Sequence, residues 1–229
     1  DRARAQHLGY EEALRDLGCE VLQLAEEPEL PDSVFVEDAA VVVDELAVVT
    51  RPGASSRRGE VQSLAEALAQ WREITQIQAP GALDGGDVLR LGRIFYVGLS
   101  SRTNAEGLRQ LALALEPRGY SVRGVELGAC LHLKSAACAV AEGVVLANPD
   151  WLDVGVFGDA EVIAVAEEEP FAANAVAVGD AVIHPAAFLL TRQRLQVRGI
   201  SVRPVEVDEL AKAEGGVSCC SVLVTVAAS

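Results

Sequence analysis

The chain has 229 residues, 50% of them hydrophobic, and its formal net charge at pH 7 is −15. Without a Pro- or Ser-rich linker, a chain of this length can bury one sizeable core, which predicts a single domain over residues 1–229. The charge argues against nucleic-acid binding, because affinity for phosphates comes from clustered Lys and Arg, and it favours a cationic small molecule as ligand. No signal peptide opens the sequence, and no apolar run reaches the about 18 residues of a membrane span.

The chain has five cysteines, an odd number without the spacing of a metal site. They indicate reduced thiols rather than a disulfide framework, so we expect a soluble protein of the cytoplasm. We expect it to be a monomer or a homodimer. The absence of Met suggests that the natural chain begins before residue 1. The cysteines are Cys19, Cys130, Cys138, Cys219 and Cys220.

Amphipathic helices alternate with apolar strands and hairpins along the whole chain. The helices are predicted at 3–17, 56–71, 103–115, 149–157 and 185–197, and the strands that follow them at 21–24, 74–77, 120–127, 161–165 and 200–207. The hairpins are predicted at 34–44 with 46–50, 88–91 with 94–98, 131–140 with 144–147 and 173–178 with 181–184, and a last strand at 219–226. Five such units of about 45 residues, each with an apolar face that its neighbours must cover, predict a fivefold pseudo-symmetric α/β propeller.

Polar residues recur at or just before the first strand of each hairpin. In chain order they are Glu37 and Asp38, Asp84 and Asp87, His132, Asn174, and Cys219. Equivalent positions in units related by an axis converge on one end of it, so we expect these side chains to meet in one cleft. A thiol, an imidazole and carboxylates are the groups of nucleophilic catalysis, in which the thiolate attacks and the imidazole transfers protons.

Each of these residues also has a structural interpretation when it is taken alone. His132 fits a hydrogen-bonded, half-buried histidine, Asp84 fits an Asp-Gly turn, and Glu37 and Asp38 fit a solvated strand edge. Cys219 and Cys220 follow a glycine turn onto a predicted strand, where neighbours point to opposite faces, so one would face the cleft and the other the interior. Both also fit small buried fillers.

Six segments resemble the dimethylarginine dimethylaminohydrolase family, in order and over nearly the whole chain. These segments span residues 30–38, 50–58, 83–89, 95–104, 131–135 and 219–223. The family belongs to the guanidine-modifying, or pentein, superfamily, whose fold is a fivefold α/β propeller. The resemblance implies hydrolysis of Nω-methylated arginines to citrulline and an alkylamine through a covalent thiouronium, with no metal or organic cofactor.

The resemblance also implies a role for each matching residue. Cys219 is the nucleophile, His132 the general acid and base, and Asp84 the acidic residue that orients His132 or the guanidinium. The implied substrate contacts are Asp32, Glu37 and Asp38 around the guanidinium and its supporting network, and Arg57 and Arg102 at the amino-acid carboxylate. Guanidinium groups suit planar carboxylates, which supports the last pair.

Several alternatives remain open. Arginine deiminase and the amidinotransferases use a similar set of groups, and agmatine deiminase acts on a substrate without a carboxylate. Ribosome anti-association factors share the propeller without catalysis. A catalytically poor homologue would bind and sequester methylarginines without hydrolysing them.

Family members also carry an N-terminal strand and a mobile loop before the first helix, which the sequence lacks because it begins at Asp1.

Overall fold

The computed structural model describes residues 2–128 and 130–226; residues 1, 129 and 227–229 lie outside the description. The chain divides into two compact units: unit 1 comprises Asp1–Gln23 and Gly128–Ser218, and unit 2 comprises Leu24–Leu127 and Cys219–Ser229. That the whole of 1–229 forms one domain stays a prediction. None of the helices in the described ranges is long and apolar enough to cross a membrane.

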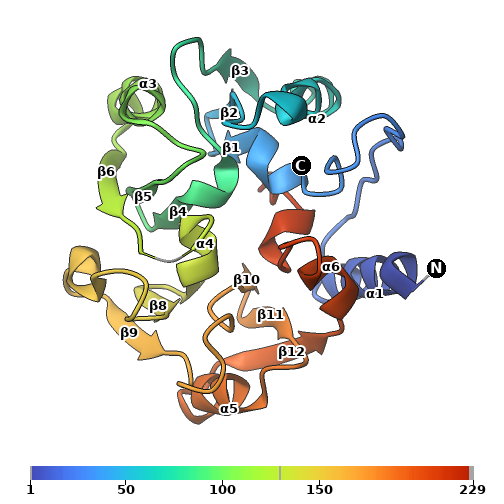
Figure 1. The fold of residues 1–229 in the computed structure, drawn as a ribbon, viewed down its shortest axis with the longest axis vertical. Coiled ribbons are helices and arrows are strands. Elements are labelled where there is room, and N and C mark those ends of the chain that lie inside the picture. Colours follow the sequence, from blue (N-terminus) through green and yellow to red (C-terminus); the bar gives the residue numbers. More distant parts are fainter. Residues whose placement is uncertain (1, 129, 227–229) are drawn as a thin grey trace. The chain divides into compact units, whose positions relative to one another are not determined.

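Four three-stranded sheets of one design occur in the described residues, two in each unit (Figure 1). In each sheet an antiparallel hairpin is joined by a third strand that runs parallel to the second. The strands of unit 2 are β1 (Ala40–Val42), β2 (Leu46–Val49), β3 (Glu73–Gln76), β4 (Val88–Leu91), β5 (Ile94–Leu99) and β6 (Ser121–Glu126). Those of unit 1 are β7 (Ala137–Ala141), β8 (Val144–Ala147), β9 (Glu161–Ala164), β10 (Val176–Val178), β11 (Ala181–Pro185) and β12 (Ser201–Val205).

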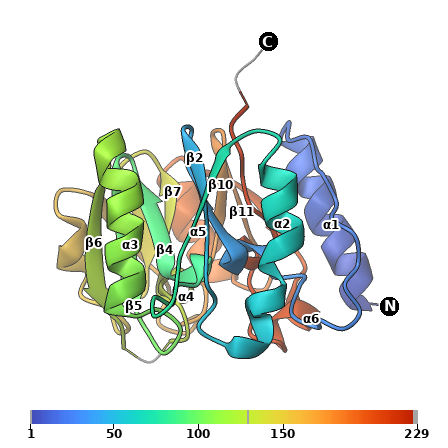
Figure 2. The same ribbon diagram turned by 90° about the horizontal axis from the view of Figure 1, so that it is seen from above.

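A parallel partner strand needs a crossover, and helices supply it in three of these sheets. The crossover helices are α2 (Val61–Leu68) before β3, α3 (Ala105–Leu115) before β6 and α5 (Leu189–Val197) before β12. Figures 1 and 2 show α3 lying along β6. The helix predicted at 149–157 is wrong in length, because only the 3₁₀ turn η5 (Val154–Phe157) forms between β8 and β9.

The remaining helices belong to unit 1. The first, α1 (Arg2–Asp16), is joined to β12 by an ion pair of 2.7 Å between Asp16 and Arg203. Near the end of the unit, α6 (Asp208–Ala211) is joined to α1 through the Asp208 carboxylate, which Arg2 contacts at 2.7 Å.

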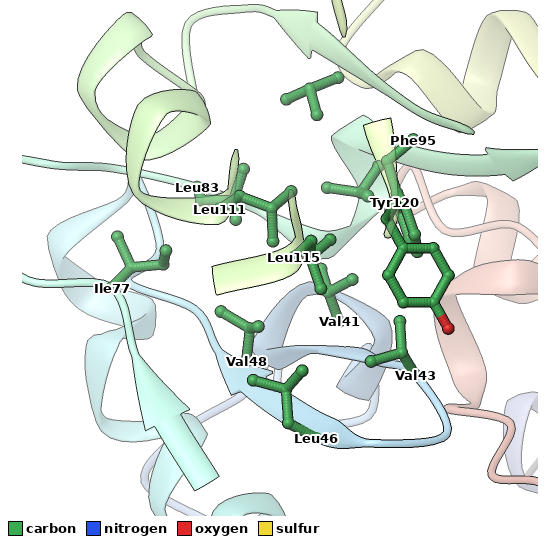
Figure 3. Packing of buried hydrophobic residues seen from close by; sticks show 12 residues of the cluster. Val41, Val43, Leu46, Val48, Ile77, Leu83, Phe95, Leu111, Leu115 and Tyr120 are labelled. Carbon is green, nitrogen blue, oxygen red and sulfur yellow. The ribbon is translucent and has the colours of Figure 1, made fainter. Parts of the chain in front are cut away.

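The larger core of unit 2 is an apolar cluster between α3 and its two sheets (Figure 3). Leu111 and Leu115 of α3 are fully buried in it (both 0% exposed), and each such side chain contributes about 2 kcal/mol. Tyr120 closes one edge of the cluster: its ring meets Phe95 edge-on at 5.4 Å, and its hydroxyl donates to Glu45 at 2.9 Å. The tyrosine therefore satisfies its polar end while it covers apolar surface.

A second apolar cluster joins the two sheets of unit 1. His184 of β11 is fully buried beside it, and one ring nitrogen lies 2.8 Å from the backbone oxygen of Ala172. Burial lowers the pKa of His184, because the charged imidazolium is poorly solvated there. Glu169 accepts hydrogen bonds from the N–H groups of Leu190 and Thr191, the first turn of α5.

The predicted strands at 21–24 and 219–226 are not strands in the structure. A fifth sheet is therefore missing from the described residues, although five were expected. Val222 and Val224 pack against the cluster around Ala39 and Ala40, so their apolar alternation reflects side-chain packing without a backbone ladder.

The strands β1 and β7 begin later than predicted, because a helical turn precedes each: η1 (Val36–Ala39) before β1 and α4 (Leu133–Ala136) before β7. A further turn, η3 (Gly85–Asp87), precedes β4, which begins at Val88 as predicted. The vicinal cysteines likewise lie on a 3₁₀ turn, η6 (Ser218–Cys220), and not on a strand. The candidate site residues therefore lie on or next to helical turns, where alternation between sheet faces does not apply.

Two helical glycines should respond oppositely to alanine. In α1, Gly9 has no heavy atom within 4 Å of a built Cβ, so Gly9→Ala should stabilise the protein by about 0.5–1 kcal/mol through helix propensity. In α3, a Cβ on Gly107 would lie 2.0 Å from the backbone oxygen of Ala82, so Gly107→Ala should destabilise it. Urea titration of both variants checks this; two shifts of equal sign would contradict the close approach at Gly107.

Candidate active site

Asp84 immediately precedes η3 and is fully buried (0% exposed). Its Oδ1 accepts a hydrogen bond from the Gly53 N–H at 2.9 Å, and its own N–H donates to Thr103 Oγ1 at 3.1 Å. A Cβ on Gly53 would lie 2.4 Å from the backbone oxygen of Arg102, so only glycine allows this approach. The segments of Asp84 and Arg102, two predicted site residues, thus both pack against the segment that contains Gly53.

Asp38 lies on η1, is 4% exposed, and binds two other segments of unit 2. Its Oδ1 accepts a hydrogen bond from the Gly86 N–H of η3 at 2.9 Å, and its Oδ2 is paired with Arg57 Nη1. The hydroxyl of Thr50 donates to the Asp38 backbone oxygen at 2.6 Å. Asp38 therefore connects the turns that carry the predicted acidic residues.

Arg57, on the 3₁₀ turn η2 (Ser55–Gly59), is 7% exposed and is bound mainly by protein groups. Its Nε donates to Glu60 at 2.9 Å and its Nη2 to the backbone oxygen of Phe35 at 3.1 Å, in addition to the pair with Asp38. The resemblance implied a ligand carboxylate as partner. One N–H of Nη1 has no hydrogen-bond partner among the described residues and can still reach a ligand.

The ion pairs of Arg57 are sheltered from solvent, which fixes their charge states. Burial alone would lower the pKa of Arg57, but the hydrogen bond to Glu60 and the charge of Asp38 outweigh it and raise the pKa. Burial also raises the pKa of Glu60, and the pairing with Arg57 offsets this only in part. The guanidinium is therefore a permanent cation that holds Asp38 in place.

Arg102, by contrast, forms no hydrogen bond or ion pair through its guanidinium with any residue in the described ranges. Its backbone is fixed: Ser100 Oγ accepts from the N–H groups of Arg102 and Thr103 at 2.9 and 3.2 Å. The Ser100 hydroxyl in turn donates to Asp87 Oδ2 at 2.6 Å, and Asp87 is fully buried. The backbone of Arg102 is thus held by hydrogen bonds, while its guanidinium has no partner in the part of the chain that the structure describes.

The two vicinal cysteines differ in environment. Cys220 is buried (9% exposed), and burial, with the charge of Glu37 adding to it, raises the pKa of its thiol to about 12. Cys219 is partly exposed. The segment that follows them lies near β1, because Val222 packs against the cluster around Ala39 and Ala40; its Thr225 backbone oxygen accepts from Arg72 Nη2.

The remaining predicted residues occupy different surroundings. Glu37 is buried on η1, where a Cβ on Gly85 would lie 2.0 Å from its backbone oxygen. Asp32 is exposed. His132 belongs to unit 1, is 8% exposed and immediately precedes α4, and its backbone oxygen accepts from the Ser135 N–H at 3.0 Å.

Hydrogen bonds within unit 2 thus bring together Asp38, Arg57, Asp84 and the segment of Arg102. The sequence analysis missed Glu60 and Ser100 as supporting residues. Arg57 and Glu60 are three residues apart on a helical turn, a spacing that allows an ion pair and was a usable signal. No local pattern links Ser100 to Asp87.

The chemistry of this region is that of a cation site. The turns η1 and η3 contribute four buried carboxyl side chains, from Glu37, Asp38, Asp84 and Asp87, while Arg57 is the nearby buried cation that pairs with Asp38. Such an excess of negative charge in a poorly solvated region favours a cationic ligand. Neither unit alone contains, in its described residues, three His, Cys, Asp or Glu side chains grouped to bind a metal ion.

Comparison with known proteins identifies matches to one family. A family model described as "N,N dimethylarginine dimethylhydrolase, eukaryotic" matches residues 1–225. The N(G),N(G)-dimethylarginine dimethylaminohydrolase of Pseudomonas aeruginosa is 38% identical over 222 residues, covering 96% of this chain and 87% of that protein. The protein of the same name from Streptomyces coelicolor is 41% identical over 215 residues, with coverages of 93% and 82%.

Solved structures agree with this result. The Pseudomonas aeruginosa protein, as a cysteine-to-serine mutant complexed with citrulline, matches this structure with a TM-score of 0.92 at 38% identity and covers 96% of this chain and 87% of its own. A histidine-to-glycine dimethylarginine dimethylaminohydrolase carrying an S-methyl-L-thiocitrulline adduct also gives 0.92, with the same coverages. The predicted α/β fold class is confirmed.

The environments of the cysteines predict unequal reactivity. With a pKa of about 12, only about one Cys220 thiol in 10⁴ is ionised at pH 8, so iodoacetamide should label Cys219 in the folded protein and leave Cys220 unmodified. Mass spectrometry of Cys219→Ser and Cys220→Ser checks this, with the urea-unfolded protein as control. Equal labelling of the two folded variants would contradict the buried environment of Cys220.

Proposed function

The chain belongs to the dimethylarginine dimethylaminohydrolase family, and we propose that it hydrolyses Nω,Nω-dimethyl-L-arginine and Nω-monomethyl-L-arginine. The products are L-citrulline and dimethylamine or methylamine. The observation that carries this proposal is the match to two family members over 96% and 93% of the chain. The family resemblance assigns the catalytic roles to Cys219, His132 and Asp84. The buried carboxyl groups of η1 and η3 support it, because a methylated guanidinium is a cation.

In the proposed reaction, Asp38 and Asp84, with Glu37 and Asp32, hold the guanidinium with its plane open to Cys219. Orientation matters because the guanidinium carbon is a poor electrophile, and correct placement removes much of the barrier. The ion pair of Arg57 with Asp38 orients the carboxyl group, and Glu60 holds Arg57 in place for this contact.

The chemical steps use side chains and water alone. The Cys219 thiolate adds to the guanidinium carbon to give a tetrahedral adduct. His132 then donates a proton to the alkylamine as the C–N bond breaks, which leaves a thiouronium on Cys219. His132 next takes a proton from water, the water oxygen attacks the same carbon, and the C–S bond breaks to release citrulline and the thiolate.

Arg102 gives the reaction its preference for amino acids. Its guanidinium, which has no partner among the described residues, binds the α-carboxylate of the substrate, and Arg57 adds one N–H. The reaction requires only a small-molecule partner, whether the protein is a monomer or a homodimer. We place it in the cytoplasm, where thiols stay reduced.

Turnover assays test the reaction. Incubation with asymmetric dimethylarginine should yield equal amounts of citrulline and dimethylamine, and Cys219→Ser should abolish this because no nucleophile remains. The control Cys220→Ser should retain turnover per folded molecule. Ammonia from arginine, with no product from dimethylarginine, would identify a deiminase instead, and saturable binding without turnover would identify a sequestering protein.

The role of Arg102 predicts a loss of selectivity. Arg102→Ala should lower kcat/KM for dimethylarginine by roughly 10- to 100-fold, the value of a charge-assisted hydrogen bond, but barely change it for the decarboxylated analogue Nω,Nω-dimethylagmatine. The exposed Arg58, whose Nε donates to the backbone oxygen of Pro52, provides the control Arg58→Ala. Equal losses on both substrates would refute a carboxylate contact by Arg102.

A further inference from the structure

Asn174 is a buried amide of unit 1 that lies two residues before β10 and is 8% exposed. Its Nδ2 donates to the Lys134 backbone oxygen at 3.1 Å and to Ser218 Oγ at 2.9 Å. Its Oδ1 accepts from the Ser218 N–H at 3.0 Å. Both donors and the acceptor of this one side chain are therefore used on two distant segments of chain.

Both segments adjoin predicted catalytic residues. Lys134 is the second residue of α4, which begins immediately after His132, and Ser218 immediately precedes Cys219. The Lys134 backbone oxygen of this four-residue helix accepts from Cys138 Sγ at 3.4 Å as well as from Asn174. Of these two donors, Asn174 is the one that also binds Ser218.

The turn before Cys219 fits closely around this amide. A Cβ on Gly216 would lie 2.3 Å from Asn174 Oδ1, well inside van der Waals contact. Glycine at 216 thus allows the backbone to approach the amide. Two observations, the hydrogen bonds and the close approach, converge on the same contact.

We propose that Asn174 is a positioning residue that ties the backbone after His132 to the backbone before Cys219. The proposal rests on the proposed function, because it gives the contact a role in catalysis. Only an amide makes all three contacts. An aspartate in its place would lose both donors and aim a negative charge at the Lys134 carbonyl oxygen, and an aliphatic residue would remove all three hydrogen bonds.

Another buried asparagine of unit 1 provides a matched control. Asn148 is 3% exposed, donates to the Pro170 backbone oxygen at 2.9 Å and accepts from the Asp150 N–H at 3.0 Å. It too joins two loop segments through a buried amide, but neither adjoins a predicted catalytic residue. Asn148→Ala therefore measures the cost of losing such an amide without the proposed role.

The test compares kinetics and stability across these variants. Asn174→Ala should lower kcat for dimethylarginine by about 100-fold, the effect of an approximately 1 Å misplacement of reacting groups, and leave KM within about 3-fold. Asn148→Ala should lower the melting temperature similarly but leave kcat per folded molecule within about 3-fold. The rate of Cys219 alkylation by iodoacetamide as a function of pH should change only in Asn174→Ala.

Two further variants keep the proposal falsifiable if Asn174→Ala does not fold. Gly216→Ala forces Asn174 and the turn apart, so kcat should fall strongly. Ser218→Ala removes only the hydrogen bond to Ser218 Oγ, so kcat should fall less. A kcat in Asn174→Ala, or in Gly216→Ala, equal to that of Asn148→Ala would overturn the proposal. Absence of turnover in the unmodified protein would instead refute the proposed function, so the two failures are distinguishable.

Discussion

Close approach between backbone segments is the constraint on which the site in unit 2 depends. A Cβ on Gly85 would lie 2.0 Å from the Glu37 backbone oxygen, and one on Gly53 would lie 2.4 Å from that of Arg102. With glycine at both positions, η1 can contact η3, and the Gly53 segment can contact the Arg102 segment. The hydrogen bonds from Gly86 to Asp38 and from Gly53 to Asp84 depend on these approaches.

The same proximity places several acidic groups in a poorly solvated region, which is unfavourable for the folded state. Arg57 offsets part of this cost by pairing with Asp38 and Glu60. The N–H groups of Gly86 and Gly53, which donate to Asp38 and Asp84, offset more of it.

Much of the fold could be predicted from the sequence, because periodicity reports which faces are buried. The strands of the four observed sheets were identified to within three residues, except that β1 and β7 begin six residues later than predicted, and α1 and α3 were identified almost to their ends. The helical turns η1, η3 and α4 were missed, because three or four residues are too few to show a period of 3.6. The strand predicted at 219–226 failed because its alternation reflects packing against Ala39 and Ala40, which no local pattern distinguishes from a ladder.

The residues of the candidate site likewise fall into two groups, those that could be predicted from the sequence and those that could not. Reactive groups such as Cys219, His132 and Asp84 could be proposed from repeat position and family resemblance, since their chemistry is visible in single letters. Supporting groups are harder to identify. Ser100 acquires meaning only through Asp87, a partner that the fold supplies, whereas Glu60 lies three residues from Arg57, a spacing that the sequence does show. The choice of Cys219 over Cys220 rested on repeat position and family resemblance. The strand that was expected to turn the two thiols to opposite faces does not form, and the two thiols differ instead in burial on a 3₁₀ turn.

Asn174 illustrates why a neutral residue can be essential at a position where other repeats carry ionisable groups. Like Asp38, it lies two residues before the first strand of its hairpin, but it bears no charge. A carboxylate there would be buried opposite the Lys134 carbonyl oxygen, where its charge would be repelled. An amide donates to that oxygen and to Ser218 Oγ and accepts from the Ser218 N–H, so it can support its neighbours without adding charge to a protein that is already strongly acidic.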